Sequence, residues 1–379
     1  MDYKSFKFLT KRRIEAGVFL IIFFGIFGFI GSRMGLPNML NTIMQTSYSL
    51  LIDTVLYIMG ITVLSGALGK LLTEFGVVRL LEVILKPLMK PLYNLPGVAA
   101  LGALLTFLSD NPAIISLAKD SNFNRYFKKY QLISLTNFGT AFGMGLVVII
   151  FMAGRGHGFA AAMGLIGAVI GSIISTRLMQ HFTTKQYPEL KIEQVDGGDE
   201  QKISFKSEGS VFLRVLNSIL DGGKTGVDLG LAIIPGVLII STFVMMLTFG
   251  PSPEGYTGKA YEGIALLPYI AGKVSFVFEW LFGFNNPELI AFPITSLGAV
   301  GAALGLIPKF QNEGLIDGNA IAVFTAMGMC WSGFLSTHTA MLDSLGYRKL
   351  TGRAIVAHTI GGLLAGIAAH WIFFLVSLF

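Results

Sequence analysis

The chain has 379 residues, of which 53% are hydrophobic and only 13% are charged, and its mean hydropathy is +0.69. Soluble domains carry about 25% charged residues, so this composition excludes a soluble globular protein and predicts an integral membrane protein. The net charge of +6 does not indicate a nucleic-acid partner, because no basic patch lies within a polar domain; it is typical of loops beside an anionic lipid leaflet.

The first part of the chain predicts two spans and a surface helix. An apolar run over 16–30 follows the basic residues 1–13 and, without a small-residue cleavage site, predicts a retained first span. A second span is predicted over 47–69. Residues 77–92 carry a charge at every third or fourth position, which places the charges on one helical face. This pattern predicts an amphipathic helix at the membrane surface.

The tripeptide Asp110-Asn111-Pro112 interrupts the next apolar stretch. At ~1.5 Å per residue, the run over 97–108 reaches only about half of a ~30 Å hydrocarbon core. Proline has no backbone N–H and disfavours helix in the preceding residue. The sequence therefore predicts a re-entrant hairpin over 97–119 that turns at this tripeptide.

The rest of the chain repeats this order. Further spans are predicted over 131–153, 159–174, 227–249, 318–342 and 354–378. Residues 180–210 read as a polar linker, 211–220 as a surface helix and 264–283 as an amphipathic to apolar segment. Asn285-Asn286-Pro287 resembles the first break, so a second hairpin is predicted to turn there.

The distribution of basic residues fixes the expected topology. With about seven spans, two re-entrant hairpins and a cytoplasmic amino terminus, nearly all of the 28 Lys and Arg residues face the cytoplasm. The exceptions are Arg33, Arg155, Lys259, Lys273 and Lys309. We expect a multi-pass protein of the bacterial inner membrane.

Two similar units follow from the same reading. Each runs span, surface helix, hairpin, span, and they occupy residues 47–153 and 211–345. One begins at the outer face and the other at the inner face, so they are predicted to be inverted repeats, as in many alternating-access transporters. The remaining parts are a first transmembrane helix (1–46), a linking helix and cytoplasmic loop (154–210) and a last helix (346–379). The predicted fold class is an all-α polytopic membrane protein.

Short motifs in both units resemble a known family. Residues 78–81 (VRLL), 85–88 (LKPL) and 100–103 (ALGA) resemble the opening of the nucleoside-recognition, or Gate, domain family, and 221–228 (DGGKTGVD) resembles the segment before its first helix. Relatives include the spore maturation membrane proteins A and B, the membrane part of ferrous iron transport protein B and, more distantly, the concentrative nucleoside transporters. The resemblance covers most of residues 45–345.

The resemblance implies where a site would lie. In concentrative nucleoside transporters, two re-entrant hairpins and two partly unwound helices form the substrate and sodium site, with glutamine, glutamate and threonine at the hairpins. Here the first hairpin carries Ser109, Asp110 and Asn111, without glutamate or glutamine.

Polar residues at the breaks and on the facing spans are the candidate substrate- or ion-binding groups. At mid-membrane a charge such as Asp110 costs at least ~2.5–3.5 kcal/mol, so either it binds an ion, proton or substrate or it caps a half-helix. Capping and binding are likewise both open for the asparagines and glutamate of the breaks. The full set is Ser109, Asp110, Asn111, Thr136, Asn137, Thr140, Asn285, Asn286, Glu288, Ser332, Ser336, His338 and Thr339.

Two groups of these residues lie within spans. Asn137 and Thr140 share a helical face and would form a site wall toward the first hairpin, or hydrogen bond between helices. The cluster at 332–339 would line a solvated cavity. His338 has no second histidine nearby in the sequence, and Cys330 is the single cysteine, so no metal site is expected.

These observations predict a secondary transporter of a small polar solute, nucleoside-like or a small organic ion, working by alternating access as the hairpins move against the third and sixth spans. A non-transporting gate or scaffold subunit with a protein partner is the alternative. No P-loop, G-x-S-x-G or H-E-x-x-H motif indicates an enzyme. No cofactor is expected beyond a coupling cation, sodium or proton. The expected partners are the small-molecule substrate, the lipid bilayer and further copies of the chain in a dimer or trimer.

Overall fold

The computed structural model describes residues 10–195 and 209–378. Within these residues, seven helical stretches are long and apolar enough to cross a membrane. They are Lys11–Met34, Leu36–Glu74, Lys129–Gly154, Gly158–Gln186, Val211–Thr248, Gly318–Ser344 and Arg348–Val376. The predicted all-α polytopic fold class is confirmed, and each predicted span falls within one of these stretches or extends at most two residues beyond its end.

Ten α-helices lie between residues 10 and 195, the described part of the first half. They are α1 (Lys11–Met34), α2 (Leu36–Ser49), α3 (Leu56–Glu74), α4 (Val77–Leu88), α5 (Ala99–Leu108), α6 (Pro112–Lys119), α7 (Ser121–Asn124), α8 (Lys129–Thr140), α9 (Gly145–Gly154) and α10 (Gly158–Gln186). A π-helical segment, Leu50–Val55, joins α2 to α3, so these two form one long helix. The predicted surface helix is α4 with its π-helical extension Met89–Tyr93.

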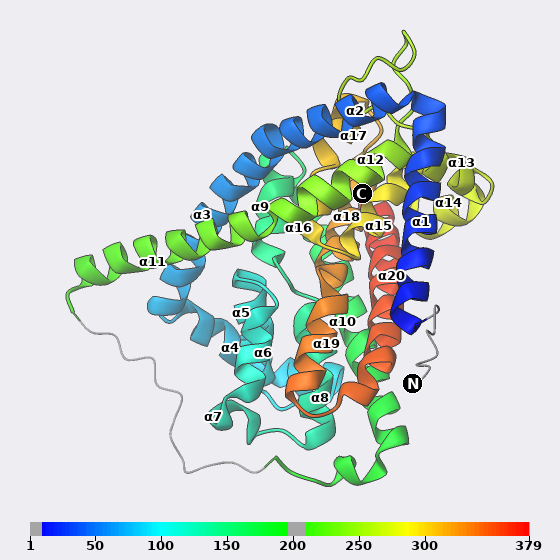
Figure 1. Cartoon of the computed structure of the whole chain (residues 1–379). Helices are drawn as coiled ribbons and strands as arrows, with labels where there is room; N and C mark the ends of the chain where they lie inside the picture. The colour runs from blue at the N-terminus through cyan, green and yellow to red at the C-terminus, as the bar shows by residue number, and fades with distance from the viewer. Residues whose placement is uncertain (1–9, 196–208, 379) are drawn as a thin grey trace, which may run out of the picture.

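The second half follows the same order. Its helices are α11 (Val211–Ala232), α12 (Thr242–Thr248), α13 (Leu266–Gly272), α14 (Ser275–Phe282), α15 (Ala291–Ser296), α16 (Val300–Leu304), α17 (Ile307–Asn312), α18 (Gly318–Trp331), α19 (Phe334–Ser344) and α20 (Thr351–Val376). The segment Gly236–Ser241 is again π-helical and lies between α11 and α12. In Figure 1, α4 and α7 lie at one end of the molecule, and α13, α14 and α17 lie at the other, as expected for inverted repeats.

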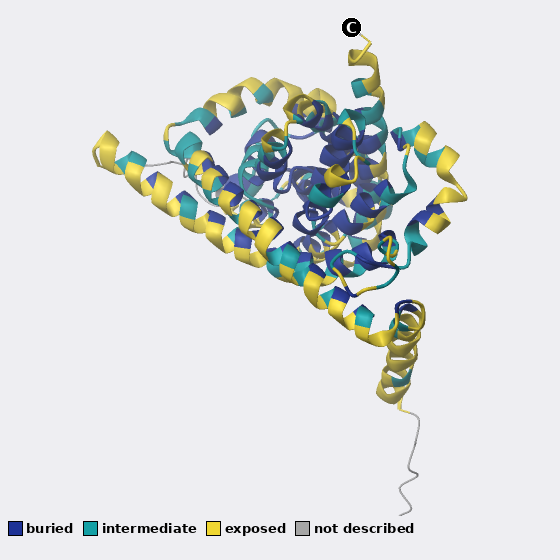
Figure 2. Ribbon diagram, turned by 90° about the horizontal axis from the view of Figure 1, so that it is seen from above, coloured by how far each residue is buried: buried dark blue, intermediate teal, exposed yellow. Residues whose placement is uncertain are grey.

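Small residues allow the central helices to approach closely. The buried residues gather around α10, α18 and α20, whereas α1 is exposed along nearly all its length (Figure 2). A Cβ atom on Gly171 of α10 would lie 2.5 Å from the carbonyl oxygen of Gly361 on α20. Without a hydrophobic force between helices in lipid, such close backbone packing supplies much of the association energy.

The long helices α3 and α11 cross in the same way (Figure 1). Thr62 Oγ1 donates to the Gly226 carbonyl across a distance of 2.7 Å, and a Cβ on Gly222 would collide with the backbone of Gly66. The prediction of a separate surface helix over 211–220 is therefore wrong. The glycines after it do not break the helix; they permit the crossing, and α11 continues from Val211 without interruption.

The first hairpin is confirmed, since α5 and α6 flank the predicted turn. The predicted turn of the second hairpin is wrong. Pro287 starts a 3-10 helix (Pro287–Ile290) at the beginning of the first arm, and the chain turns later, at 297–299, before α16. A proline at the first helical position fits a helix start, because its missing N–H would be unpaired there anyway. Asn285-Asn286-Pro287 thus corresponds to Asn94-Leu95-Pro96, which precedes α5.

Candidate functional site

The two hairpin turns meet at a break in the sixth span. Between α18 and α19, Gly333 adopts a left-handed conformation with φ of 58°, which glycine reaches without the strain of a Cβ atom. A Cβ on Gly333 would lie 3.8 Å from Asn111 Nδ2 of the first turn and 4.0 Å from the Gly298 carbonyl oxygen of the second. Asn111 Nδ2 also donates to the Ser332 carbonyl at this break.

The third span is broken at the corresponding place. It is interrupted at 141–144, and Met144 has φ of 54°. Gly139 and Gly143 allow the first hairpin to pack closely against this span, because they have no side chain. A Cβ on Gly139 would lie 2.5 Å from Ile114 Cγ1, and one on Gly143 would collide with the Asn111 amide. Two hairpin turns and two unwound helices therefore converge, with backbone polar groups freed at each break.

A cavity of about 600 Å³, lined by both apolar and polar side chains, lies between the first hairpin and the crossed helices α3 and α11. Its size is within the usual range for ligand pockets, about 300–1,000 Å³. Polar and charged side chains from all three walls line it: Thr62, Ser65, Lys70, Thr73, Ser109, Asp110, Ser116, Thr225 and Asp228. The cavity extends from the hairpin turn to the last turns of α3.

Asp110 brings an incompletely paired carboxylate to this cavity. The backbone N–H of Asn111 interacts with the carboxylate, but Oδ1 is buried and accepts no hydrogen bond from the described residues. The neighbouring Ser109 hydroxyl donates to the Leu105 carbonyl across 2.6 Å and is engaged within its own helix. Since a buried carboxylate oxygen is stable only with a proton, a cation or a donor, the cavity favours one of these at Asp110.

The candidate residues on α8 form hydrogen bonds within and between helices. Asn137 donates to Ser175 Oγ on α10 and to the Ala354 carbonyl on α20, both at 2.9 Å. Of the two roles that the sequence left open for Asn137, the structure shows hydrogen bonds between helices, and the glycine face of α8 holds the first hairpin instead. The Thr140 hydroxyl donates to the Thr136 carbonyl at 2.6 Å, and the buried Thr136 hydroxyl has no partner among the described residues.

The cluster at 332–339 does not share one cavity. Ser336 and Thr339 are exposed, and their hydroxyls donate to carbonyls of their own helix or its first turn. His338 is fully buried, and its ring lies 4.6 Å from that of His358, centroid to centroid. Helix α20 therefore places a second histidine beside His338. The sequence does not show this contact, because the two residues lie far apart along the chain.

The two histidines have different surroundings. His358 Nε2 contacts the Cys330 carbonyl, which can only accept, so Nε2 donates; Nδ1 lies 3.1 Å from Ser175 Oγ and accepts from it. Both ring nitrogens of His338 are buried without a partner in the described residues. No group of three or more His, Cys, Asp or Glu residues in the described part of the chain could hold a metal ion.

The second asparagine pair and Glu288 lie away from Asp110. Asn285 is exposed, and Asn286 donates to the Leu315 carbonyl across 3.1 Å. Glu288 lines a separate polar cavity of about 420 Å³, together with Lys309 and Glu313. The structure therefore does not bring these three residues to the first hairpin turn.

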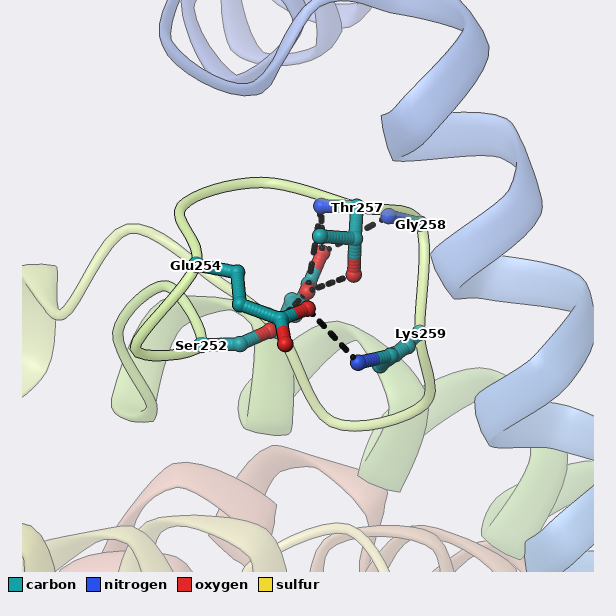
Figure 3. A network of polar contacts seen from close by, with 6 residues as sticks. Ser252, Glu254, Thr257, Gly258 and Lys259 are labelled. Atoms are coloured by element: carbon teal, nitrogen blue, oxygen red, sulfur yellow. Dashed lines mark hydrogen bonds and ion pairs between the residues drawn. The ribbon is translucent and has the colours of Figure 1, made fainter.

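Glu262 and the loop after α12 line this second cavity. Figure 3 shows the side chains of Ser252, Glu254, Thr257 and Lys259 on this loop. Glu262 is only 3% exposed and accepts hydrogen bonds from three loop residues, Ser252, Thr257 and Gly258. Burial alone would raise the pKa of Glu262, but these hydrogen bonds to the charged form outweigh it and lower the pKa below its ordinary value. Lys259 pairs with Glu254 at 3.1 Å on the loop surface.

Comparison with known proteins supports the same architecture. Residues 55–156 match the family model described as Gate, nucleoside recognition. A doubly substituted CNTnw, a concentrative nucleoside transporter, in an outward-facing state superimposes with a TM-score of 0.54 at 12% identity, over 96% of this chain and 86% of that one. CNTnw in an inward-facing substrate-bound state gives 0.52 at 14% identity, over 84% and 75%.

A comparison with curated protein sequences found no significant match. At these identities, the structural likeness shows the fold alone. The chain is therefore a multi-pass helical membrane protein that resembles the Gate family over residues 55–156 and has a fold similar to that of CNTnw.

Proposed function

We propose that this protein is a secondary transporter of a small polar solute in the bacterial inner membrane, with its amino terminus in the cytoplasm. The observation that carries the proposal is the cavity in front of the first hairpin turn, which receives polar side chains from the hairpin, α3 and α11 and has the incompletely paired Asp110 in its wall. A sealed interface would favour a scaffold or gate subunit, whereas a cavity of ligand size that contains several polar side chains favours transport.

The contacts indicate which parts would move together. The first hairpin is packed against α8 through Gly139 and is bonded to the α18–α19 break through Asn111. It faces α3 and α11 across the cavity. We therefore infer that the first hairpin moves with the third and sixth spans against the crossed helices, rather than against those spans. Proteins solved in several states support such motion by analogy: CNTnw has outward-facing, intermediate and inward-facing structures.

Asp110 and the hydroxyls beside it would bind the substrate or a coupling cation, sodium or proton. Unpaired amides at the start of α6, where Pro112 begins the helix, would add a partial positive charge beside the cavity. In this proposal the chain functions without a cofactor and forms a homo-oligomer in the bilayer.

A test without a known substrate uses access to the hairpin turn. In a Cys330→Ser background, Ser109→Cys would react with a membrane-impermeant maleimide in inside-out and in right-side-out vesicles. Alternating access predicts labelling from both sides. Labelling from one side only, under all ionic conditions, would contradict transport.

A disulfide lock makes the test specific. A Cβ on Gly236 would lie 3.6 Å from the Ala299 Cβ, suitable for a disulfide between the long second-half helix and the second hairpin turn. Oxidised Gly236→Cys/Ala299→Cys protein should be labelled at position 109 from one side only, and reduction should restore the other. The matched control, Ala153→Cys/Gly158→Cys, has the same 3.6 Å separation between α9 and α10 and should leave two-sided labelling unchanged.

A further inference from the structure

The charged residues that line the cavity at the first hairpin indicate which kind of solute it can bind. Three of its lining residues are charged: Asp110 and Asp228 are acidic, and Lys70 is basic. Asp110 is half-buried with its Oδ1 atom fully buried, whereas Lys70 and Asp228 are exposed. The fixed charge deepest in the cavity is therefore negative, which disfavours an organic anion there.

Two polar groups, one on the hairpin and one on α3, lack partners within the described residues. They are Asp110 Oδ1 and the hydroxyl of Ser65, whose residue is only 1% exposed. Other nearby hydroxyls are already engaged: Thr62 with the Gly226 carbonyl, and Thr73 with that of Gly69. Unsatisfied buried polar groups are costly unless a ligand or water completes them.

None of the described residues that line this cavity is aromatic. Nucleobases are commonly held by stacking on aromatic side chains, worth about 1–3 kcal/mol per base. The lining instead consists of small hydroxyl residues, aliphatic chains and glycines. This composition suits a compact polar solute better than a planar heterocycle.

We propose that the solute bound in this cavity carries an ammonium group, which donates to Asp110 Oδ1 and to Ser65 Oγ. This inference rests on the proposed transport function and names the substrate class of the same site. An ammonium supplies three donors and a positive charge, so its chemistry matches both the carboxylate oxygen and the hydroxyl oxygen. Lys70, at the last turns of α3, stands where it can receive a carboxylate if the solute is an amino acid rather than a simple amine.

The test is thermal stability of the purified full-length chain in detergent, titrated with defined probes. The probes are ethanolamine, choline, serine, uridine, lactate, and sodium or potassium chloride. We expect ethanolamine or serine to raise the Tm. A larger effect of ethanolamine indicates a simple amine as the solute, and a larger effect of serine indicates an amino acid. Choline, which has no N–H donors, should bind more weakly than ethanolamine.

Variants then locate the binding. Asp110→Asn should raise the apparent Kd about 10- to 100-fold, as expected for losing a hydrogen bond between charged groups, and Ser65→Ala about 2- to 10-fold. Asp343→Asn, an exposed carboxylate on α19 outside this cavity, is the matched control and should change nothing. If Asp110→Asn fails to fold, the apparent Kd of Ser65→Ala alone shows whether the solute binds in this cavity.

Other outcomes overturn the inference. Stabilisation by uridine or lactate but not by the amines would contradict it and leave the transport function standing. Stabilisation by inorganic cations alone, lost in Asp110→Asn, would make the site one for a coupling ion and not for an ammonium solute. If no probe stabilises the protein, the inference fails, and two-sided labelling of Ser109→Cys decides separately whether the transport function stands.

Discussion

The contact between the first hairpin and α8 can be tested by adding one methyl group. In Gly139→Ala, the new Cβ would lie 2.5 Å from Ile114 Cγ1 and 2.7 Å from Ile114 Cβ, so one of the helices must shift. Overpacking of this kind costs about 1–3 kcal/mol, whereas replacing a helical glycine by alanine gains up to about 1 kcal/mol. We expect a net loss of about 1 kcal/mol in the free energy of unfolding.

A double-mutant cycle isolates the contact. Ile114 is fully buried, so Ile114→Ala alone should cost about 2–5 kcal/mol by leaving a cavity. In the Gly139→Ala background the added methyl occupies part of that space, and the double variant should be more stable than the sum of the single changes predicts, by about 1 kcal/mol or more. Unfolding by SDS in mixed micelles measures each free energy.

The control is Gly25→Ala on α1, where a Cβ would meet nothing within 4 Å, so stability should stay the same or rise. Additivity of the two substitutions within about 0.5 kcal/mol would refute the close packing of the hairpin on α8. It would also remove the basis for assigning the hairpin to the same moving body as the third span.

Three further predictions use other parts of the molecule. Gly222→Ala should destabilise the crossing of α3 and α11 by about 1–3 kcal/mol in SDS unfolding, whereas Gly223→Ala, whose Cβ has a normal 3.6 Å contact, should not. The pKa of Glu262 is lowered in the fold, so its stabilisation is full above its ordinary pKa and is lost as pH falls through the lowered value; melting of Glu262→Gln should show none of this acid dependence. Ser336→Ala and Thr339→Ala should leave both Tm and ligand binding unchanged, because their hydroxyls bond locally and are exposed; weakened binding would return them to the site.

Much of the fold could be predicted because the membrane imposes simple rules. Apolar runs of sufficient length give the spans, and a proline in a run too short to cross gives the first hairpin. The same reasoning misplaced the second hairpin turn because Pro287 marks a helix start there. The true turn contains Gly298, which is hard to distinguish in a chain with 46 glycines.

The site was less accessible to sequence reasoning because it depends on which helices meet. The wall provided by Ser65 and Lys70 of α3 was not predicted, although small and polar residues recur on α3 at helical spacing. The approach of His358 to His338 and the orientation of Asn137 toward α10 likewise come from tertiary packing. Periodicity identifies a helical face but not its neighbour.

We propose that the first hairpin and the crossed helices α3 and α11 are separate bodies that move against each other. The most direct measurement is the distance between two spin labels by pulsed electron paramagnetic resonance. The labels are attached to cysteines that replace Gly60 of α3 and Lys119 at the end of α6, in a Cys330→Ser background. A Cβ on Gly60 would meet nothing within 4 Å, and Lys119 is exposed, so both accept a label. The account predicts at least two distance populations whose ratio changes with a stabilising ligand, whereas a reference pair on Gly60 and Lys224, both on the crossed helices, gives one. A single unchanging population for both pairs would contradict it.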